Sequence, residues 1–215
     1  MIIDEVLDGI DAVIVDWDGT VVDSQQANYR ALNQALRPHG VYLDRAWYRD
    51  HAGLSIVDLL TEVIAVHGEL PTTEIIATSR QRLLAGLDQL RPVPATIELL
   101  DHAQDRGLPC AVASGAIRPL VAGGISALHL AHLFAAVVTR EDVHHGKPAP
   151  DLYLRAAATL NVTPQRCLAV DDADDGVTAA RLAGMRVLTL RDQRLCSPNA
   201  APTFKTAAER TSTPL

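Results

Sequence analysis

The chain has 215 residues, of which 48% are hydrophobic and 21% charged, as in an ordinary globular protein. A formal net charge of −7 without a basic cluster disfavours a nucleic-acid partner. No apolar run is long enough to span a membrane and the first residues lack a signal-peptide pattern, so we expect a cytoplasmic protein without a membrane partner. The three cysteines are too few and too scattered for a disulfide framework or a zinc site: Cys110, Cys167 and Cys196.

The first expected element is a short buried strand over residues 13–15, which is followed by Asp16 and Asp18. In extended backbone, residues two apart project to the same side, so the two carboxylates converge beyond the strand, where parallel sheets bind ligands. A divalent cation would relieve their repulsion and leave one carboxylate as a nucleophile, while the other, protonated, would serve as a general acid. Taken alone, the stretch is more typical of a solvated Asp-Gly turn.

Residues 22–90 are predicted to form a helical insert, because apolar residues recur there at helical spacing and no convincing strand lies among them. Prolines and glycines separate the segments, and Pro92 and Pro94 mark the return to the first domain. The expected helices cover residues 26–36, 56–67 and 73–90.

Strands and helices alternate after residue 91, which is typical of a parallel sheet covered by helices on both faces. We therefore predict an α/β protein with a doubly wound parallel sheet, built from residues 1–21 and 91–196. The tail, residues 197–215, is rich in Ala, Pro, Thr and Ser and is expected to be loosely ordered. The expected strands cover residues 108–113, 136–139, 167–170 and 186–190. The expected helices cover residues 96–106, 117–130 (with Gly123 and Gly124 as a weak point), 150–160 and 176–183.

Four segments of this expected sheet deliver polar groups at or just beyond the end of a strand. Acids from the first and fourth segments could build a site for a hard cation such as Mg²⁺. A hydroxyl, backbone N–H groups and an ammonium from the second and third segments suit the oxygens of a phosphate. The combination is typical of phosphoryl transfer. The groups are Asp16 and Asp18, Ser114 and Gly115, Lys147, and Asp171 with Asp172.

Each of these features has an ordinary explanation when it is taken singly. Lys147 alone is more typical of a solvated surface lysine, and Ser114 of a helix N-cap. The acidic run at 171–175 is compatible with the first turn of a helix, where the helix dipole favours negative charge. Four such features in order, at the ends of successive strands, favour the functional interpretation.

The same residues resemble the four motifs of the haloacid dehalogenase superfamily of phosphotransferases. Within it, the chain is similar to the β-phosphoglucomutase-like branch of small-molecule phosphatases and mutases, and residues 143–185 especially to bacterial sugar-phosphate phosphatases. That branch carries an α-helical cap between its first and second motifs, where this chain has residues 22–90. The resemblance therefore implies a Rossmann-like core with an inserted helical cap. The matching residues are Asp16-Trp17-Asp18-Gly19-Thr20, Ser114, Gly146-Lys147-Pro148-Ala149-Pro150-Asp151 and Asp171-Asp172.

The resemblance also implies a role for each matching residue. Asp16 would be the nucleophile that forms an aspartyl-phosphate, and Asp18 would protonate the leaving oxygen and then activate water. Thr20 would belong to the phosphate-binding group by hydrogen bonding around the nucleophile. The phosphoryl oxygens would be held by Ser114, Gly115 and Lys147. The Mg²⁺ ligands would be Asp16, the backbone carbonyl of Asp18, Asp171 and Asp172, with Asp175 in support.

The chain departs from the family pattern at three positions, none of which is among the matching residues. The stretch from Gly53 to Asp58 resembles the substrate-specificity loop of the cap, and the mutases carry there an arginine for a second phosphate, where this chain has Ile56. The absence of that arginine favours water as the final phosphoryl acceptor. Ala173 stands where the branch usually has serine, a change that some sugar phosphatases share, and Asn28 stands at a frequent histidine. The residues expected on the leaving-group side are His51, Gly53, Ser55 and Ile56.

We therefore predict a Mg²⁺-dependent phosphatase acting on a small phosphorylated metabolite, foremost a sugar phosphate, as a monomer or homodimer. The enzyme alternative is a sugar phosphomutase, which would require a bisphosphate activator. Two alternatives come from other classes of protein. A receiver-type phospho-acceptor is disfavoured because receivers lack an insert of this size. A non-catalytic binding protein is disfavoured because it would need none of the motif residues, all of which are present here. His129 and His132 lie one helical turn apart, but no carboxylate accompanies them, so a metal site there is disfavoured.

Overall fold

The computed structural model describes residues 3–51 and 54–196, and the chain divides into two compact units. Within the described residues, unit 1 combines the segments up to Ser24 and from Leu87 onward, and unit 2 comprises Gln25–Gly86. None of the described helices combines the length and apolar character that a membrane crossing requires.

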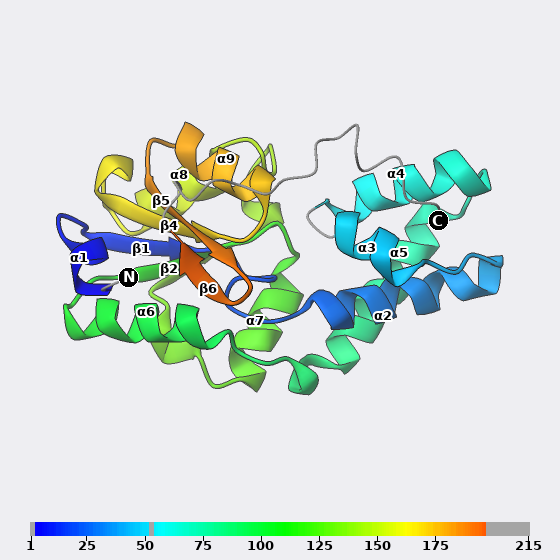
Figure 1. Cartoon of the computed structure of the whole chain (residues 1–215), viewed down its shortest axis with the longest axis horizontal. Coiled ribbons are helices and arrows are strands. Elements are labelled where there is room, and N and C mark those ends of the chain that lie inside the picture. The colour runs from blue at the N-terminus through cyan, green and yellow to red at the C-terminus, as the bar shows by residue number, and fades with distance from the viewer. Residues whose placement is uncertain (1–2, 52–53, 197–215) are drawn as a thin grey trace. The chain divides into compact units, whose positions relative to one another are not determined.

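Unit 1 is built on a sheet whose strands, among the described residues, follow the order β3-β2-β1-β4-β5-β6 (Figure 1). The central strand β1 pairs in parallel with β2 and β4, so that Val15 lies opposite both Val112 and Val170. Chain segments that follow these three strands therefore leave the sheet at one edge, where parallel sheets bind ligands. The strands are β1 (Ala12–Val15), β2 (Cys110–Ala113), β3 (Ala136–Val138), β4 (Cys167–Asp171), β5 (Arg186–Arg191) and β6 (Arg194–Cys196).

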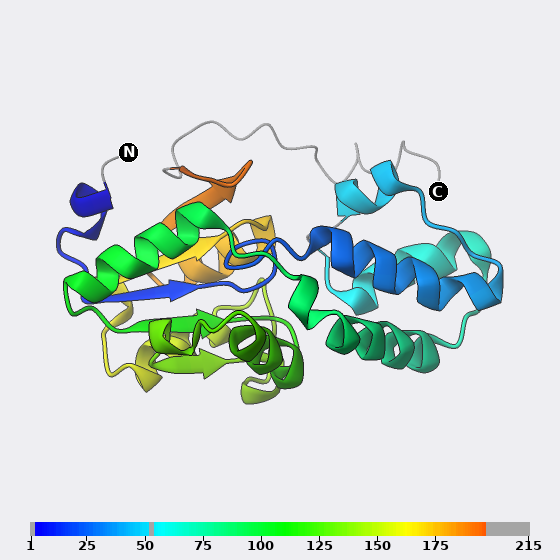
Figure 2. The ribbon, with the colours of Figure 1, turned by 90° about the horizontal axis from the view of Figure 1, so that it is seen from below.

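Helices cover both faces of this sheet (Figures 1 and 2). Alternate residues of β1 project to opposite faces, so Val13 and Val15 join one apolar cluster and Ala12 and Ile14 join the other. The predicted doubly wound α/β class is confirmed, with the correction that β6 runs antiparallel to β5. One face packs against α1 (Ile3–Leu7), α6 (Pro94–Asp105) and α7 (Arg118–Ala127), and the other against α8 (Asp151–Thr159) and α9 (Asp174–Leu182).

The helix α7 continues through both of its glycines, so the predicted weak point does not interrupt it. A Cβ atom added to Gly123 would lie 2.6 Å from Cδ1 of Leu87, and one added to Gly124 would lie 2.6 Å from the Trp17 ring. The glycines therefore provide room for close packing. The short 3₁₀ helices of unit 1 are η2 (Leu87–Gln89), η3 (Ala131–Leu133), η4 (Arg140–Asp142) and η5 (Pro164–Arg166).

The chain leaves and re-enters unit 1 through a pair of antiparallel backbone segments, which we call the stem. Val22 forms a β-bridge with Pro92. On either side of it, the N–H of Asp23 donates to the carbonyl of Arg91 at 2.8 Å, and the N–H of Val93 donates to the carbonyl of Val21 at 2.8 Å. The stem therefore fixes both ends of the intervening chain within unit 1.

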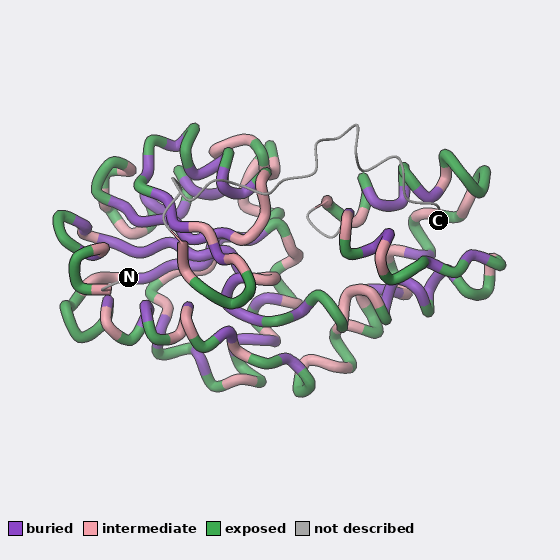
Figure 3. The backbone as a smooth tube through the Cα atoms, viewed as in Figure 1, coloured by how far each residue is buried: buried purple, intermediate pink, exposed green. Residues whose placement is uncertain are grey.

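The regular elements of unit 2, among its described residues, are all helices, and the unit has an apolar core of its own, seen as buried stretches in Figure 3. Ser55 caps α4 by accepting a hydrogen bond from the N–H of Asp58 at 3.2 Å. The helix predicted over residues 73–90 ends at Ala85, because Gly86 follows and residues 87–89 form the separate turn η2. The helix α3 was not predicted from the sequence. The elements are α2 (Gln25–Leu36), η1 (Arg37–His39), α3 (Arg45–His51), α4 (Ile56–His67) and α5 (Thr72–Ala85).

Candidate active site

The loop after β1 presents the first two candidate residues. The N–H of Asp16 donates to the carbonyl of Val170 at 2.9 Å, which extends the pairing of β1 with β4 by one residue, and Asp16 is 7% exposed. Trp17 points the other way, into the apolar cluster beneath α7. Its carbonyl accepts from the N–H groups of Val21 and Val22 at 3.0 and 3.1 Å, which closes a tight turn that holds Asp18 partly buried.

Lys147 lies between two carboxylates of the sheet edge. Its ammonium donates to Oδ1 of Asp16 at 2.5 Å and to Oδ2 of Asp171 at 2.7 Å. The three side chains are 12%, 10% and 1% exposed, respectively, so the ion pairs are buried. Burial makes such pairs sensitive to loss of one partner, because the other charge is then left uncompensated.

The loop that carries Lys147 is held on both sides of it. Oδ1 of Asp151 accepts from the backbone N–H of His145 at 3.2 Å and lies 3.1 Å from Nδ1 of the same histidine. The guanidinium of Arg140 donates to the carbonyls of Val143 and His144 at 2.9 and 3.2 Å. These bonds fix the path of the loop and with it the position of the ammonium.

Asp171, the last residue of β4, has protein donors on both carboxylate oxygens. Oδ2 accepts from Lys147 and also from the hydroxyl of Tyr153, at 2.6 Å, and Oδ1 accepts from the N–H of Ala173 at 3.0 Å. A Cβ atom at Gly176 would lie 1.8 Å from Oδ2, so this carboxylate fits only because α9 has a glycine there. Asp171 therefore supports Lys147 and shapes the loop that follows.

Asp172 is bound to Thr20 by two hydrogen bonds. The hydroxyl of Thr20 donates to Oδ1 of Asp172 at 2.9 Å and accepts from its N–H at 3.1 Å. The one hydroxyl proton of Thr20 is thus given to Asp172, and the predicted place of Thr20 in the phosphate-binding group stays a prediction. Gly19 has a φ of +84°, and a Cβ there would lie 2.3 Å from Oδ2 of Asp172, so a glycine is required on both counts.

Ser114 and Gly115 follow β2 at the same edge of the sheet. The N–H of Ser114 donates to the carbonyl of Val138 at 2.9 Å, and its Oγ accepts from the N–H of Ala116 at 3.0 Å. The second bond uses a lone pair and leaves the hydroxyl proton able to donate to a ligand. A Cβ atom at Gly115 would meet nothing within 4 Å, so the backbone there is open on that side.

The charges of the site shift one another's protonation. Burial above all raises the pKa of Asp16 well above 3.8, and the neighbouring carboxylates add to the rise while Lys147 opposes it. Burial also raises the pKa of Asp172 to about 6, with repulsion from Asp171 as the next cause. Burial alone would lower the pKa of Lys147, but Asp16 and Asp171 outweigh it, so the pKa lies above 10.5 and the ammonium stays charged.

The carboxylates form a group that fits a divalent cation. Oxygens of Asp16, Asp171 and Asp172 all lie within 4.8 Å of one another. Three carboxylates around one ammonium leave an excess of negative charge, which a hard cation with oxygen ligands would neutralise. The side chain of Asp18 is outside this group, and its predicted contribution through the backbone carbonyl stays a prediction.

The cap residues expected to face the leaving group lie in unit 2 or outside the described residues. His51 is 6% exposed, stacks on Trp47 with 4.1 Å between ring centroids, and has Nδ1 2.7 Å from the carbonyl of Trp47. Ser55 donates to Oδ2 of Asp58 at 2.6 Å, and Ile56 begins α4. Gly53 lies outside the described residues.

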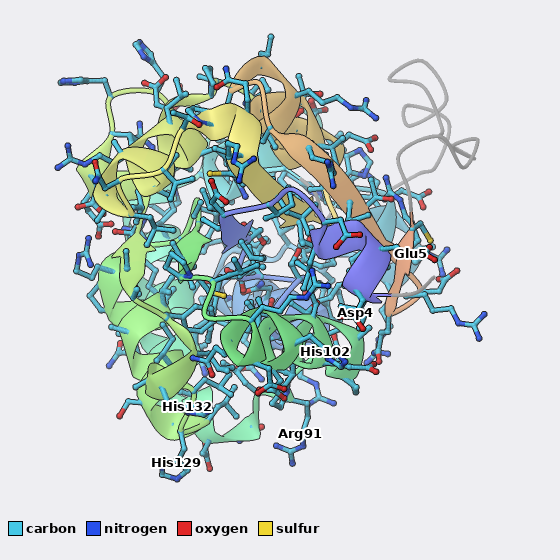
Figure 4. All side chains as sticks on the ribbon, turned by 90° about the vertical axis from the view of Figure 1, so that its left-hand side faces the viewer. Asp4, Glu5, Arg91, His102, His129 and His132 are labelled. Carbon is cyan, nitrogen blue, oxygen red and sulfur yellow. The ribbon has the colours of Figure 1, made fainter. Side chains whose placement is uncertain are left out.

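The histidines that the sequence analysis set aside are at the surface of unit 1. His129 and His132 project outward at the lower end of Figure 4, and Nδ1 of His132 lies 3.0 Å from the carbonyl of His129. Neither belongs to a group of three potential ligands within the described part of the chain.

Three residues that contact this site were not predicted from the sequence: Tyr153, Gly176 and Arg191. Tyr153 was detectable only as an inward position of a helix, which indicates packing and not its bond to Asp171. A glycine within the first turns of a predicted helix is a sign of close approach, and Gly176 meets that description. Arg191, whose guanidinium donates to the carbonyl of Asp172 at 2.8 Å, left no signal in the sequence.

Residues 10–184 match the family of haloacid dehalogenase-like hydrolases. Hexitol phosphatase A of Escherichia coli (strain K12) is 30% identical over 82% of this chain and 81% of its own length. The fructose-1-phosphate phosphatase of the same organism is 29% identical over 83% and 95%. The crystal structure of CbbY from Rhodobacter sphaeroides in complex with phosphate superposes with a TM-score of 0.74 at 26% identity, covering 84% of this chain and 85% of that one.

The chain therefore belongs to the haloacid dehalogenase-like hydrolases, and the predicted superfamily is confirmed. Within that family it is a phosphoric monoester hydrolase. Hydrolases of this family use a divalent metal, for which the cluster of Asp16, Asp171 and Asp172 offers ligands.

Proposed function

We propose that the protein is a Mg²⁺-dependent phosphatase that hydrolyses a small phosphorylated metabolite, foremost a sugar phosphate, through a phosphoryl group carried on Asp16. The observation that carries this proposal is the buried ammonium of Lys147 between Asp16 and Asp171, with Asp172 beside them. An ammonium in contact with the nucleophile stabilises its anionic form and attracts the negatively charged phosphoryl group to it.

In the first step, a carboxylate oxygen of Asp16 attacks phosphorus and the bond from phosphorus to the leaving oxygen breaks. Asp18, two residues further along, donates a proton to that oxygen. In the second step, Asp18 takes a proton from water, and the water oxygen attacks phosphorus and releases Asp16. Inorganic phosphate and an alcohol are the products, so atoms and charges balance.

The phosphoryl oxygens would be held by donors from two further loops. Ser114 can donate its hydroxyl proton, and the open backbone at Gly115 can offer N–H groups. Lys147 adds a charged donor, which is stronger than a neutral one. The role of Thr20 in our proposal differs from the prediction, since it orients Asp172.

Mg²⁺ would be held by Asp16, Asp172 and the carbonyl of Asp18, with Asp171 alongside, and it would neutralise charge that develops on the phosphoryl oxygens. Among divalent cations, Mg²⁺ favours a site with few carboxylates because it keeps several of its waters.

The proposed substrate class is supported by two relatives, which are named as a fructose-1-phosphate phosphatase and a hexitol phosphatase. We propose that unit 2 selects among sugar phosphates, with Ile56 leaving no cation for a second phosphate, and with His51, Gly53 and Ser55 contributing to the choice. Exchange of Ile56 for arginine should then shift the ranking of substrates towards bisphosphates.

The test is phosphate release from a panel of sugar phosphates, polyol phosphates and nucleotides, with Mg²⁺ and with a chelator. We expect turnover that the chelator abolishes, that Asp16→Asn eliminates and that Asp18→Ala lowers by about 10²–10⁴-fold. Asp101→Asn, at an exposed position of α6, removes the same charge and serves as the matched control. Turnover that survives Asp16→Asn would refute the assignment of Asp16 as the nucleophile. The absence of turnover on the whole panel would refute the proposed function.

A further inference from the structure

The hairpin of β5 and β6 lies beside the acidic loop that follows β4. β5 pairs in parallel with β4, so that Thr189 lies opposite Asp171, and the chain then continues for two residues to Arg191. It turns back through Asp192 and Gln193, whose φ values of 47° and 58° are those that two-residue hairpins require. The turn therefore places Arg191 next to the loop of residues 171–175.

The guanidinium of Arg191 bridges two points of that loop. One terminal nitrogen donates to the carbonyl of Asp172 at 2.8 Å, and the other donates to Oδ1 of Asp174 at 3.0 Å. Both side chains of the ion pair are partly exposed, 38% for Arg191 and 41% for Asp174, so the charge attraction itself is largely screened by solvent. The bond to the carbonyl acts differently, because it fixes the backbone of a residue whose side chain belongs to the carboxylate cluster.

Asp172 is thereby held from two directions. Thr20 binds its carboxylate and its N–H, and Arg191 binds its carbonyl. On the inner side, Asp171 accepts from the N–H of Ala173 and so fixes the next residue. A carboxylate whose backbone is fixed loses less freedom when it coordinates a cation than one on an unsupported loop.

We infer that Arg191 is a positioning residue that presets Asp172 for the divalent cation. The inference rests on the proposed function in one respect, namely that the carboxylate cluster binds Mg²⁺. In this proposed role, Arg191 acts through Asp172 and contacts neither the cation nor the reacting atoms. Its loss should therefore weaken binding of the cation and leave the chemical step intact once the cation is saturating.

The experiment measures Mg²⁺ binding to the metal-free full-length protein by isothermal titration calorimetry, together with phosphate release as a function of Mg²⁺ concentration. The variants are Arg191→Ala and Arg191→Lys. The matched control is Arg194→Ala, because Arg194 lies directly across the hairpin from Arg191 and is exposed, so the same charge is removed from the same turn.

We expect Arg191→Ala to raise the Kd for Mg²⁺ by about 10-fold or more, in the range that loss of a residue supporting a metal ligand produces. Arg194→Ala should bind Mg²⁺ as the wild type does. Arg191→Lys should lie in between, because one ammonium lacks the fork of donors that reaches both acceptors. The rate at saturating Mg²⁺ should stay near that of the wild type in all three.

Equal Mg²⁺ affinity in Arg191→Ala and Arg194→Ala would overturn the inference, as would a wild type that binds no Mg²⁺. A circular dichroism melt identifies a variant that fails to fold, in which case Arg191→Lys decides: affinity equal to the wild type would overturn the inference. The two proposals fail separately. A wild type without phosphatase activity whose Mg²⁺ affinity depends on Arg191 refutes only the proposed function, whereas an active wild type with equal affinities refutes only the positioning role.

Discussion

Replacement of Asp172 by asparagine should stabilise the metal-free protein while it abolishes the response to Mg²⁺. Asparagine keeps the shape of the side chain, and its carbonyl oxygen can still accept the hydrogen bond from Thr20 that Oδ1 accepts now. What it removes is a negative charge that is partly buried close to Asp16 and Asp171.

The size of the effect follows from the pKa of Asp172, which burial and repulsion from Asp171 raise from 3.8 to about 6. A rise of that size corresponds to about 3 kcal/mol of destabilisation by the ionised form. For an acid whose pKa is raised by folding, the penalty is absent below the unfolded pKa, grows between the two pKa values and is complete above the folded one. Asp172→Asn should therefore raise the free energy of unfolding by about 3 kcal/mol at about pH 7.5 and by only about 1 kcal/mol at about pH 4.5.

The assay is urea unfolding followed by circular dichroism, in a chelator, at both pH values. Mg²⁺ at about 100 times its Kd should then stabilise the wild type by about 2.7 kcal/mol and leave Asp172→Asn nearly unchanged. Asp101→Asn controls for the loss of one negative charge from the exposed surface. If Asp172→Asn is less stable than the wild type at the higher pH in chelator, the reasoning from burial and repulsion is refuted.

Three further predictions test other parts of the site and the core. Tyr153→Phe removes the bond to Asp171 at 2.6 Å and should lower the free energy of unfolding by about 1–3 kcal/mol, so a urea midpoint equal to that of the wild type would contradict it. Exchange of a helical glycine for alanine normally stabilises the helix by about 1 kcal/mol. In Gly176→Ala, however, the added Cβ would overlap the carboxylate of Asp171, so both thermal stability and activity should fall. A variant that is more stable and still active would show that the overlap is relieved at no cost. Ellman's reagent should modify the partly exposed Cys196 rapidly, and Cys110 and Cys167 slowly until the protein is unfolded. The reason is that burial raises the pKa of Cys110 to about 12 and that of Cys167 to about 11. Equal rates for all three thiols would disprove this explanation.

The parts of the site that the sequence predicted are those set by local geometry. Asp16 follows a strand whose residues are all buried, and the alternation of side chains along extended backbone separates it from Trp17. The alternation of strands and helices likewise predicts a parallel sheet, which brings Lys147 and Asp171 to the edge that holds Asp16. Motifs at strand ends could therefore be placed without coordinates.

The parts that the sequence did not predict depend on contacts between distant segments. Thr20 follows Asp16 by four residues in the chain but binds Asp172, 152 residues away. Tyr153 reaches Asp171 from another helix, and Arg191 reaches Asp172 from a strand end. β6 was missed because it has three residues and because the turn before it has no glycine to signal a hairpin.

The stem at Val22 and Pro92 has an evolutionary consequence. Backbone pairing holds the two ends of the intervening chain about 5 Å apart, the spacing of adjacent strands, whatever lies between them. An insertion, deletion or exchange of the segment Gln25–Gly86 is then a local event that leaves the sheet edge with Asp16 and Lys147 intact. If unit 2 selects the substrate as we propose, a lineage can acquire new substrates by replacing one module, while the residues at the sheet edge are inherited unchanged.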